Sequence, residues 1–250
     1  MLHTATMLSV IPLLLSLITS TAAADQAVIQ WTFVQKGLSG VIPVEAIAIN
    51  ENIFVFYDRA DGNPLLLPDG EKAWAALWNL ETSEATALSS ITDTFCAGGS
   101  FISNGTLVSV AGQPLENPGE PPADGRLGIR LFGPCPSLTG ENCTVFEDPE
   151  HIHLAAMRWY PTGLRIPDGS LMIIGGAHSN TFYNLDAENS IEFFPSRPGE
   201  EGMVRPSQFL LDAEPVNLFP RSVVPIPTST VLISSFSHID PSFSHPAKSS

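Results

Sequence analysis

The chain has 250 residues, of which 44% are hydrophobic, so it is long enough and apolar enough to bury one sizeable core or two small ones. Its 26 acidic residues outnumber 11 Lys and Arg residues, which gives a formal net charge of −15. A charge of this sign and size repels phosphate backbones and anionic lipid, so we expect neither nucleic acid nor a membrane surface as a partner.

The N-terminus carries the pattern of a secretory signal peptide. An apolar run, Met7–Ile18, is followed by small residues that end at Ala24. The run is shorter than the roughly 20 residues that a bilayer-spanning helix needs, and no basic cluster follows it. Two N-glycosylation sequons, at Asn104 and Asn142, agree with export. We therefore expect residues 1–24 to be a signal peptide, the protein to be secreted, and both asparagines to be glycosylated.

The mature region is predicted to be all-β. It shows little helical periodicity and many short apolar runs separated by turn-forming residues, and the chain holds 22 prolines and 19 glycines. A unit of two strands joined by a tight turn recurs four times. The units are Val44–Ile49 with Ile53–Tyr57, Ser100–Ser103 with Thr106–Ala111, Thr162–Ile166 with Ser170–Ile174, and Ser222–Ile226 with Thr230–Ser234.

The regular spacing of these units indicates a kelch-type β-propeller, whose blades have four strands and a period of about 50 residues. Further strands complete the first three blades. They are predicted at Ala73–Leu80 and Ala85–Ser89, at Gly128–Phe132 and Thr144–Phe146, and at Ile191–Phe194 and Gln208–Leu211. Because a closed propeller needs at least about four blades, we expect residues 25–233 to form an incomplete propeller of about three blades plus the start of a fourth. Residues 234–250 are rich in Ser and Pro and are predicted to be a divergent, disordered tail.

The chain has three cysteines, an odd number for an exported protein. Cys135 and Cys143 bracket a short segment rich in turn formers, which favours a disulfide between them. Cys96 is then left over. The cysteine count alone leaves two interpretations of Cys96 open, a buried thiol outside any disulfide or an intermolecular disulfide.

Two stretches of sequence resemble the galactose oxidase and glyoxal oxidase group of copper-radical oxidases. They are Asp93–Gly112, which contains Cys96, and Arg158–Gly176, which contains Tyr160. Further stretches are similar to glyoxal oxidase in particular, and the resemblance runs from about residue 30 to residue 233. These further stretches are Phe56–Arg59, Ala75–Leu80, Asp124–Arg126, Arg130–Cys135, Phe146–Pro149, Asn189–Ser190 with Glu192–Pro195, and Asn217–Arg221.

The resemblance implies a role for Cys96 and Tyr160. In this family a cysteine and a tyrosine are joined by a thioether, and the modified tyrosine binds copper and carries a protein radical. Sulfur on the ring lets the unpaired electron spread, which lowers the oxidation potential of the phenolate. The implied substrates are small aldehydes or α-hydroxycarbonyls, oxidised to carboxylic acids while dioxygen is reduced to hydrogen peroxide. Extracellular peroxidases that use the peroxide are the implied partners.

The sequence departs from the family pattern at the other copper ligands. The family also uses a second tyrosine, a histidine directly after it and a distant histidine, and no Tyr-His dipeptide occurs in this chain. His151, His153 and His178 are interpreted as ordinary loop residues. We therefore expect an N-terminal part of a copper-radical oxidase in which the copper and Cys-Tyr radical centre is not assembled and the fragment is inactive. The alternatives are a non-catalytic secreted propeller module that binds a partner, or a truncated product without function.

Overall fold

A computed structural model describes residues 31–57, 62–114, 123–179, 186–213, 218–223 and 232–234. The predicted signal peptide and almost all of the predicted Ser/Pro-rich tail lie outside these ranges. The chain divides into two compact units, Met1–Gln35 and Lys36–Ser250. Every helix and strand that the structure describes belongs to the second unit. No helix among the described residues is long and apolar enough to cross a membrane.

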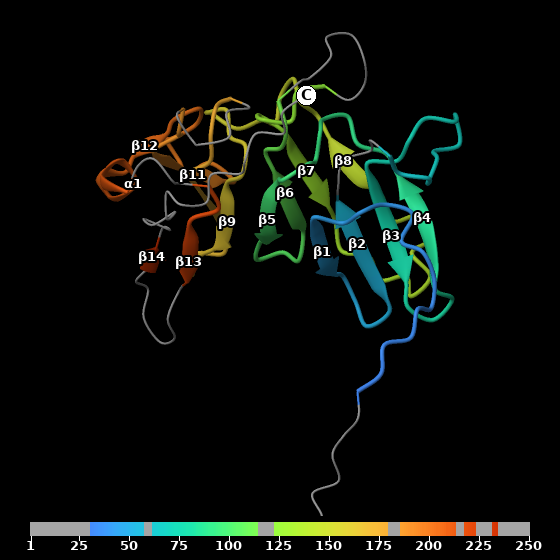
Figure 1. Cartoon of the computed structure of the whole chain (residues 1–250). Helices are drawn as coiled ribbons and strands as arrows, with labels where there is room; N and C mark the ends of the chain where they lie inside the picture. The colour runs from blue at the N-terminus through green and yellow to red at the C-terminus, as the bar shows by residue number, and fades with distance from the viewer. Residues whose placement is uncertain are drawn as a thin grey trace, which may run out of the picture. The chain divides into compact units, whose positions relative to one another are not determined.

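The described part of the second unit is nearly all β-structure, which confirms the predicted fold class (Figure 1). It contains three four-stranded antiparallel sheets, each with its strands in sequence order. The first sheet consists of β1 (Glu45–Ala48), β2 (Ile53–Tyr57), β3 (Ala75–Asn79) and β4 (Glu84–Leu88). The second consists of β5 (Gly98–Phe101), β6 (Leu107–Val110), β7 (Ile129–Phe132) and β8 (Val145–Glu147).

The third sheet and a shorter fourth one follow. The third consists of β9 (Thr162–Arg165), β10 (Leu171–Ile174), β11 (Ser190–Phe194) and β12 (Arg205–Pro206). The fourth has two strands, β13 (Arg221–Val223) and β14 (Leu232–Ser234). The four predicted two-strand units therefore all occur as antiparallel pairs. The kelch-type propeller itself stays a prediction.

One predicted strand is wrong. Gln208–Leu211, expected as the last strand of the third blade, lies in the short helix α1 (Gln208–Asp212), and the fourth strand of this sheet is β12. The strand ends at a proline, and the next residue, Ser207, accepts hydrogen bonds at its carbonyl from the amides of Leu210 and Leu211. Leu210 is fully buried in a cluster with Met172 and Ile174 of the third sheet. The four residues Gln208–Leu211 are apolar or neutral, so their sequence is equally compatible with a strand and a helix. Burial of Leu210 stabilises the helix.

The hydrophobic core lies between consecutive sheets. Strand β6 is buried along its whole length because each of its faces packs against a different sheet. Leu107 packs in one cluster with Ile53 and Val55 of the first sheet. Val108 and Val110 pack in another cluster with residues of the third sheet, among them Leu171 and Ile173. Alternate residues of β6 therefore face two different neighbouring sheets, and neither face of the strand is open to solvent.

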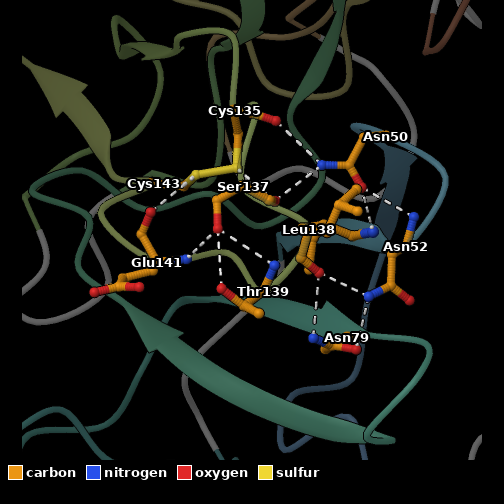
Figure 2. The surroundings of a disulfide bond; sticks show 10 residues. Asn50, Asn52, Asn79, Cys135, Ser137, Leu138, Thr139, Glu141 and Cys143 are labelled. Atoms are coloured by element: carbon orange, nitrogen blue, oxygen red, sulfur yellow. Dashed lines mark hydrogen bonds between the residues drawn. A yellow bond between two sulfur atoms is a disulfide. The ribbon is translucent and has the colours of Figure 1, made fainter.

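A disulfide loop fastens the second sheet to the first (Figure 2). Cys135 and Cys143 form a disulfide with a Cα–Cα distance of 5.6 Å, in the loop between β7 and β8. The side-chain amide of Asn50, in the β1–β2 turn, donates hydrogen bonds to the carbonyls of Cys135 and Ser137, each at 3.1 Å. The amide of Asn52 donates to the carbonyl of Leu138 at 2.7 Å. The pairing that the spacing of the cysteines predicted therefore closes a loop that the first sheet holds in place.

Candidate active site around Cys96 and Tyr160

The structure brings Cys96 and Tyr160 together, although 64 positions separate them in the chain. Cys96 comes two residues before β5 and Tyr160 two residues before β9, and these two strands are neighbours. The backbone amide of Tyr160 donates a hydrogen bond to the carbonyl of Cys96 at 3.3 Å. A side-chain hydrogen bond joins the Tyr160 phenol to the Cys96 thiol. The Cys96 side chain and the Tyr160 hydroxyl are therefore neighbours.

Both residues adopt the left-handed backbone conformation, with φ of 57° at Cys96 and 62° at Tyr160. This conformation is strained for residues that have a Cβ atom, and it persists where surrounding structure enforces it. Such strain concentrates at functional sites. The backbone conformations of Cys96 and Tyr160 therefore cost conformational free energy, which the packing around the two turns offsets.

Two glycines allow β5 and β9 to come this close. A Cβ atom at Gly98 would lie 2.5 Å from the carbonyl oxygen of Pro161. A Cβ atom at Gly163 would lie 2.8 Å from the Cα atom of Gly99. Both obstacles are backbone atoms, which cannot rotate away as a flexible side chain could. Any larger residue at either position would push apart the strands that carry Cys96 and Tyr160.

Aromatic side chains cover the Tyr160 ring. The Trp159 indole lies against it with ring centroids 4.3 Å apart and an interplanar angle of 30°. The Phe219 ring meets it edge-on at 5.3 Å, and the Phe219 amide donates a hydrogen bond to the Tyr160 carbonyl at 2.8 Å. The indole N–H of Trp159 donates to the carbonyl of Phe95, the residue before Cys96. Trp159 therefore contacts both the Tyr160 ring and the residue that precedes Cys96.

The electrostatic environment keeps the Tyr160 phenol protonated. Burial raises its pKa well above the usual range, and the charge and hydrogen bond of the neighbouring Cys96 raise it further. Cys96 is itself buried, while Tyr160 is partly exposed. A bound cation would reverse this balance because it stabilises both the phenolate and the thiolate.

The described residues bring one cysteine and one tyrosine together at the starts of the neighbouring strands β5 and β9. Among the described residues, however, no group of three or more His, Cys, Asp or Glu side chains could hold a metal ion. Cys96 and Tyr160 therefore lack, among the described residues, the further side chains that would complete a metal centre.

The histidines of the described region have other partners. His151 bonds the carboxylate of Asp148 at 2.9 Å, and His153 bonds the carbonyl of Leu154. His178 lies between the carboxylates of Asp186 and Glu188. Burial lowers the pKa of His178, but its bonds to these two carboxylates outweigh burial and raise it. These contacts agree with the interpretation of the histidines as loop residues.

The two predicted glycosylation sites lie on the surface. Asn104 is exposed in the β5–β6 turn, where its side-chain oxygen accepts a hydrogen bond from the Thr106 amide at 2.9 Å. Asn142 is exposed in the disulfide loop and has a φ of 60°. Glycosylation at either position stays a prediction.

Comparison with known proteins identifies the family. Residues 67–233 match the model of the glyoxal oxidase N-terminus. The chain belongs to the glyoxal oxidase N-terminus family. It is 32% identical over 151 residues to the aldehyde oxidase GLOX of Vitis pseudoreticulata, covering 59% of this chain and 24% of that protein. It is 30% identical over 210 residues to the aldehyde oxidase GLOX1 of Arabidopsis thaliana, covering 76% of this chain and 30% of that protein.

The matched region of this glyoxal oxidase family member is thus only about a quarter to a third of the length of these relatives. Among solved structures, the chain is similar to a fungal alcohol oxidase of the AA5 family in complex with copper, with a TM-score of 0.41 and 17% identity. That likeness covers 62% of this chain and 28% of the other. The family match includes both Cys96 and Tyr160.

Proposed function

We propose that this chain supplies the cysteine and tyrosine of a copper-radical site that oxidises small aldehydes or α-hydroxycarbonyls outside the cell. The meeting of Cys96 and Tyr160 at the starts of two neighbouring strands, where the Tyr160 amide bonds the Cys96 carbonyl, carries this proposal. Membership of the glyoxal oxidase N-terminus family and similarity to aldehyde oxidases support it. In the proposed reaction, an aldehyde hydrated by one water molecule gives up two electrons and two protons to become a carboxylic acid. Dioxygen takes them to become hydrogen peroxide, which extracellular peroxidases consume.

Cofactor formation joins the two side chains. The S–H bond of Cys96 and the C–H bond ortho to the Tyr160 hydroxyl break, and one C–S bond forms between sulfur and ring. The two electrons and two protons released reduce dioxygen to hydrogen peroxide, so the step balances. Copper, when bound, supplies a partner for one-electron chemistry at the phenol. The chain's own contribution is to hold sulfur against the ring and to cover the ring with Trp159 and Phe219.

The environment of Tyr160 suits an oxidised ring. The stacked indole excludes water from one ring face and can share the positive character of a radical through its π-system. The carbonyl of Tyr160 is fixed by the Phe219 amide. Partial exposure of Tyr160 leaves access for a small substrate.

The test is a cross-linking reaction on the purified mature chain. Incubation with copper(II) in air, followed by digestion after Lys and Arg, releases Cys96 in the peptide 73–126 and Tyr160 in the peptide 159–165. We expect the two peptides to be joined and two hydrogens lighter than their sum. The variant Cys96→Ser and an incubation without oxygen should both leave them separate. Separate, unmodified peptides from the copper-treated wild-type chain would refute the proposal.

Turnover of aldehydes is a separate matter. Because no second tyrosine followed by histidine occurs in the 250 residues, we expect the chain alone to form the thioether without producing peroxide from glyoxal.

Release of the chain into the culture medium, beginning after Ala24, tests the proposed export. Retention inside the cell with residues 1–24 still attached would contradict it.

A further inference from the structure

Arg158 is a fully buried guanidinium that lies two residues before Tyr160. Its Nε donates a hydrogen bond to Glu192 at 2.7 Å. One terminal nitrogen donates to the carbonyls of Gly175 and Ser190, at 2.8 Å and 3.1 Å, and the other donates to the hydroxyl of Ser190 at 2.8 Å. All four contacts are with the third sheet or the segment that directly follows β10.

The backbone of the same residue is bonded to the second sheet and its loops. The Arg158 amide donates to the carbonyl of Arg126 at 2.9 Å, shortly before β7. Its carbonyl accepts a hydrogen bond from the amide of Gly112, just after β6, at 3.4 Å. Arg158 therefore connects two sheets, its main chain to the second and its side chain to the third. Cys96 precedes the first strand of the second sheet, and Tyr160 precedes the first strand of the third.

The charge of this guanidinium is compensated inside the same network. Glu192 is 5% exposed, and its other carboxylate oxygen accepts a hydrogen bond from the Ala155 amide at 2.7 Å. A buried ion pair with all its hydrogen bonds made adds little net stability compared with apolar residues, but it fixes one arrangement of its partners. Because Arg158 lies two residues before Tyr160, the arrangement that the ion pair fixes includes the backbone turn of Tyr160.

We infer that Arg158 is a positioning residue for the proposed cofactor: it sets the turn of Tyr160 relative to Cys96, and Glu192 and Ser190 orient it. The inference rests on the proposed function. The side chain of Arg158 bonds Glu192, Gly175 and Ser190. Its effect on the cofactor therefore passes through the backbone of Trp159 and Tyr160. Lysine cannot replace it, because a single ammonium cannot reach Glu192, Gly175 and Ser190 with the planar fork geometry of a guanidinium.

The test compares the rate of thioether formation in Arg158→Lys with that in wild type, across a pH series in copper(II) and air. We expect the plateau rate to fall at least ten-fold while the pH midpoint of the reaction stays where it is in wild type. Arg165→Lys is the matched control, because Arg165 lies on β9 and is exposed. It should cross-link at the wild-type rate.

A milder variant covers the case in which Arg158→Lys does not fold. Ser190→Ala removes one hydrogen bond to the guanidinium and leaves the ion pair with Glu192 in place. We expect it to slow cross-linking two- to five-fold with an unchanged midpoint. Wild-type plateau rates in both variants would overturn the inference while leaving the proposed function standing. A pH midpoint of cross-linking that shifts to the value of a cysteine in an unfolded chain would also overturn it. Such a shift would show that the substitution unfolds the site and does not only misplace Tyr160. Absence of cross-linking in wild type would overturn the proposed function as well.

Discussion

Replacing Gly163 by alanine should separate Cys96 from Tyr160 without touching either side chain. Gly163 lies on β9, three residues after Tyr160, and faces Gly99 of β5. Its φ lies outside the left-handed region, so alanine is acceptable to the backbone at this position and only the contact across the strands matters. The perturbation is therefore a single methyl group placed between the two strands that carry the proposed cofactor.

The size of the effect follows from the space available. The new Cβ would lie 2.8 Å from the Gly99 Cα atom and 3.0 Å from its nitrogen, whereas ordinary contacts begin near 3.4 Å. The strands must move apart by roughly 0.6 Å or more, and overpacking of this kind costs about 1–3 kcal/mol of unfolding free energy. A misplacement on the order of 1 Å at reacting groups can slow a reaction about 100-fold. We expect the rate of thioether formation to fall about 10- to 100-fold.

The assay is the peptide cross-linking reaction in copper(II) and air, together with urea unfolding of the uncross-linked chain. Gly133→Ala is the matched control, because a Cβ atom at Gly133 would meet nothing within 4 Å. The control should cross-link as wild type does. If Gly163→Ala also cross-linked at the wild-type rate while being destabilised as expected, the close approach of β5 and β9 would not determine the distance between sulfur and ring, and the reasoning would be refuted.

Two further predictions concern the packing of the first sheet against the second. Burial raises the pKa of Glu45 to about 7 although the charge of Arg130 lowers it, so its contribution to stability is present below about pH 4.5 and is lost as the pH rises through 7. In urea unfolding at a series of pH values, the unfolding free energy of wild type should fall by at most about 3 kcal/mol over that range, and that of Glu45→Gln should not fall in this way. The same dependence of unfolding free energy on pH in both proteins would contradict the assignment. Replacing Cys135 and Cys143 together by alanine should lower the unfolding free energy by about 2–3 kcal/mol, and an unchanged value in urea would show that Asn50 and its neighbours hold the loop without the disulfide.

Much of the strand arrangement could be predicted from the sequence because local signals determine it. β2 is a short run of five apolar residues, IFVFY, which is typical of a buried strand, and in the structure its alternate residues Ile53, Val55 and Tyr57 are buried. The β5–β6 turn contains Asn104-Gly105 and the β9–β10 turn contains Asp168-Gly169, and the conformational preferences of these dipeptides are local. The pairing of Cys135 with Cys143 could likewise be predicted, since only a short turn-rich segment separates them.

Other features depend on contacts between distant parts of the chain, and a single sequence does not encode them visibly. The four apolar or neutral residues Gln208–Leu211 fit a strand as well as a helix, and only burial of Leu210 against the third sheet decides. The proximity of Cys96 to Tyr160 was predicted from family resemblance, because no residue pattern connects two turns so far apart. The network of Arg158 with Glu192 was missed, since its acceptors are largely backbone carbonyls that any sequence provides.

The most direct test is the mass of the digested wild-type chain after exposure to copper(II) and oxygen. We predict one species that contains both peptides, 73–126 and 159–165, and has two hydrogens fewer than their sum. Its fragment ions should locate the bond at Cys96 and Tyr160. Recovery of the two peptides as separate, unmodified species would contradict the central claim that this chain is built to join that sulfur to that ring.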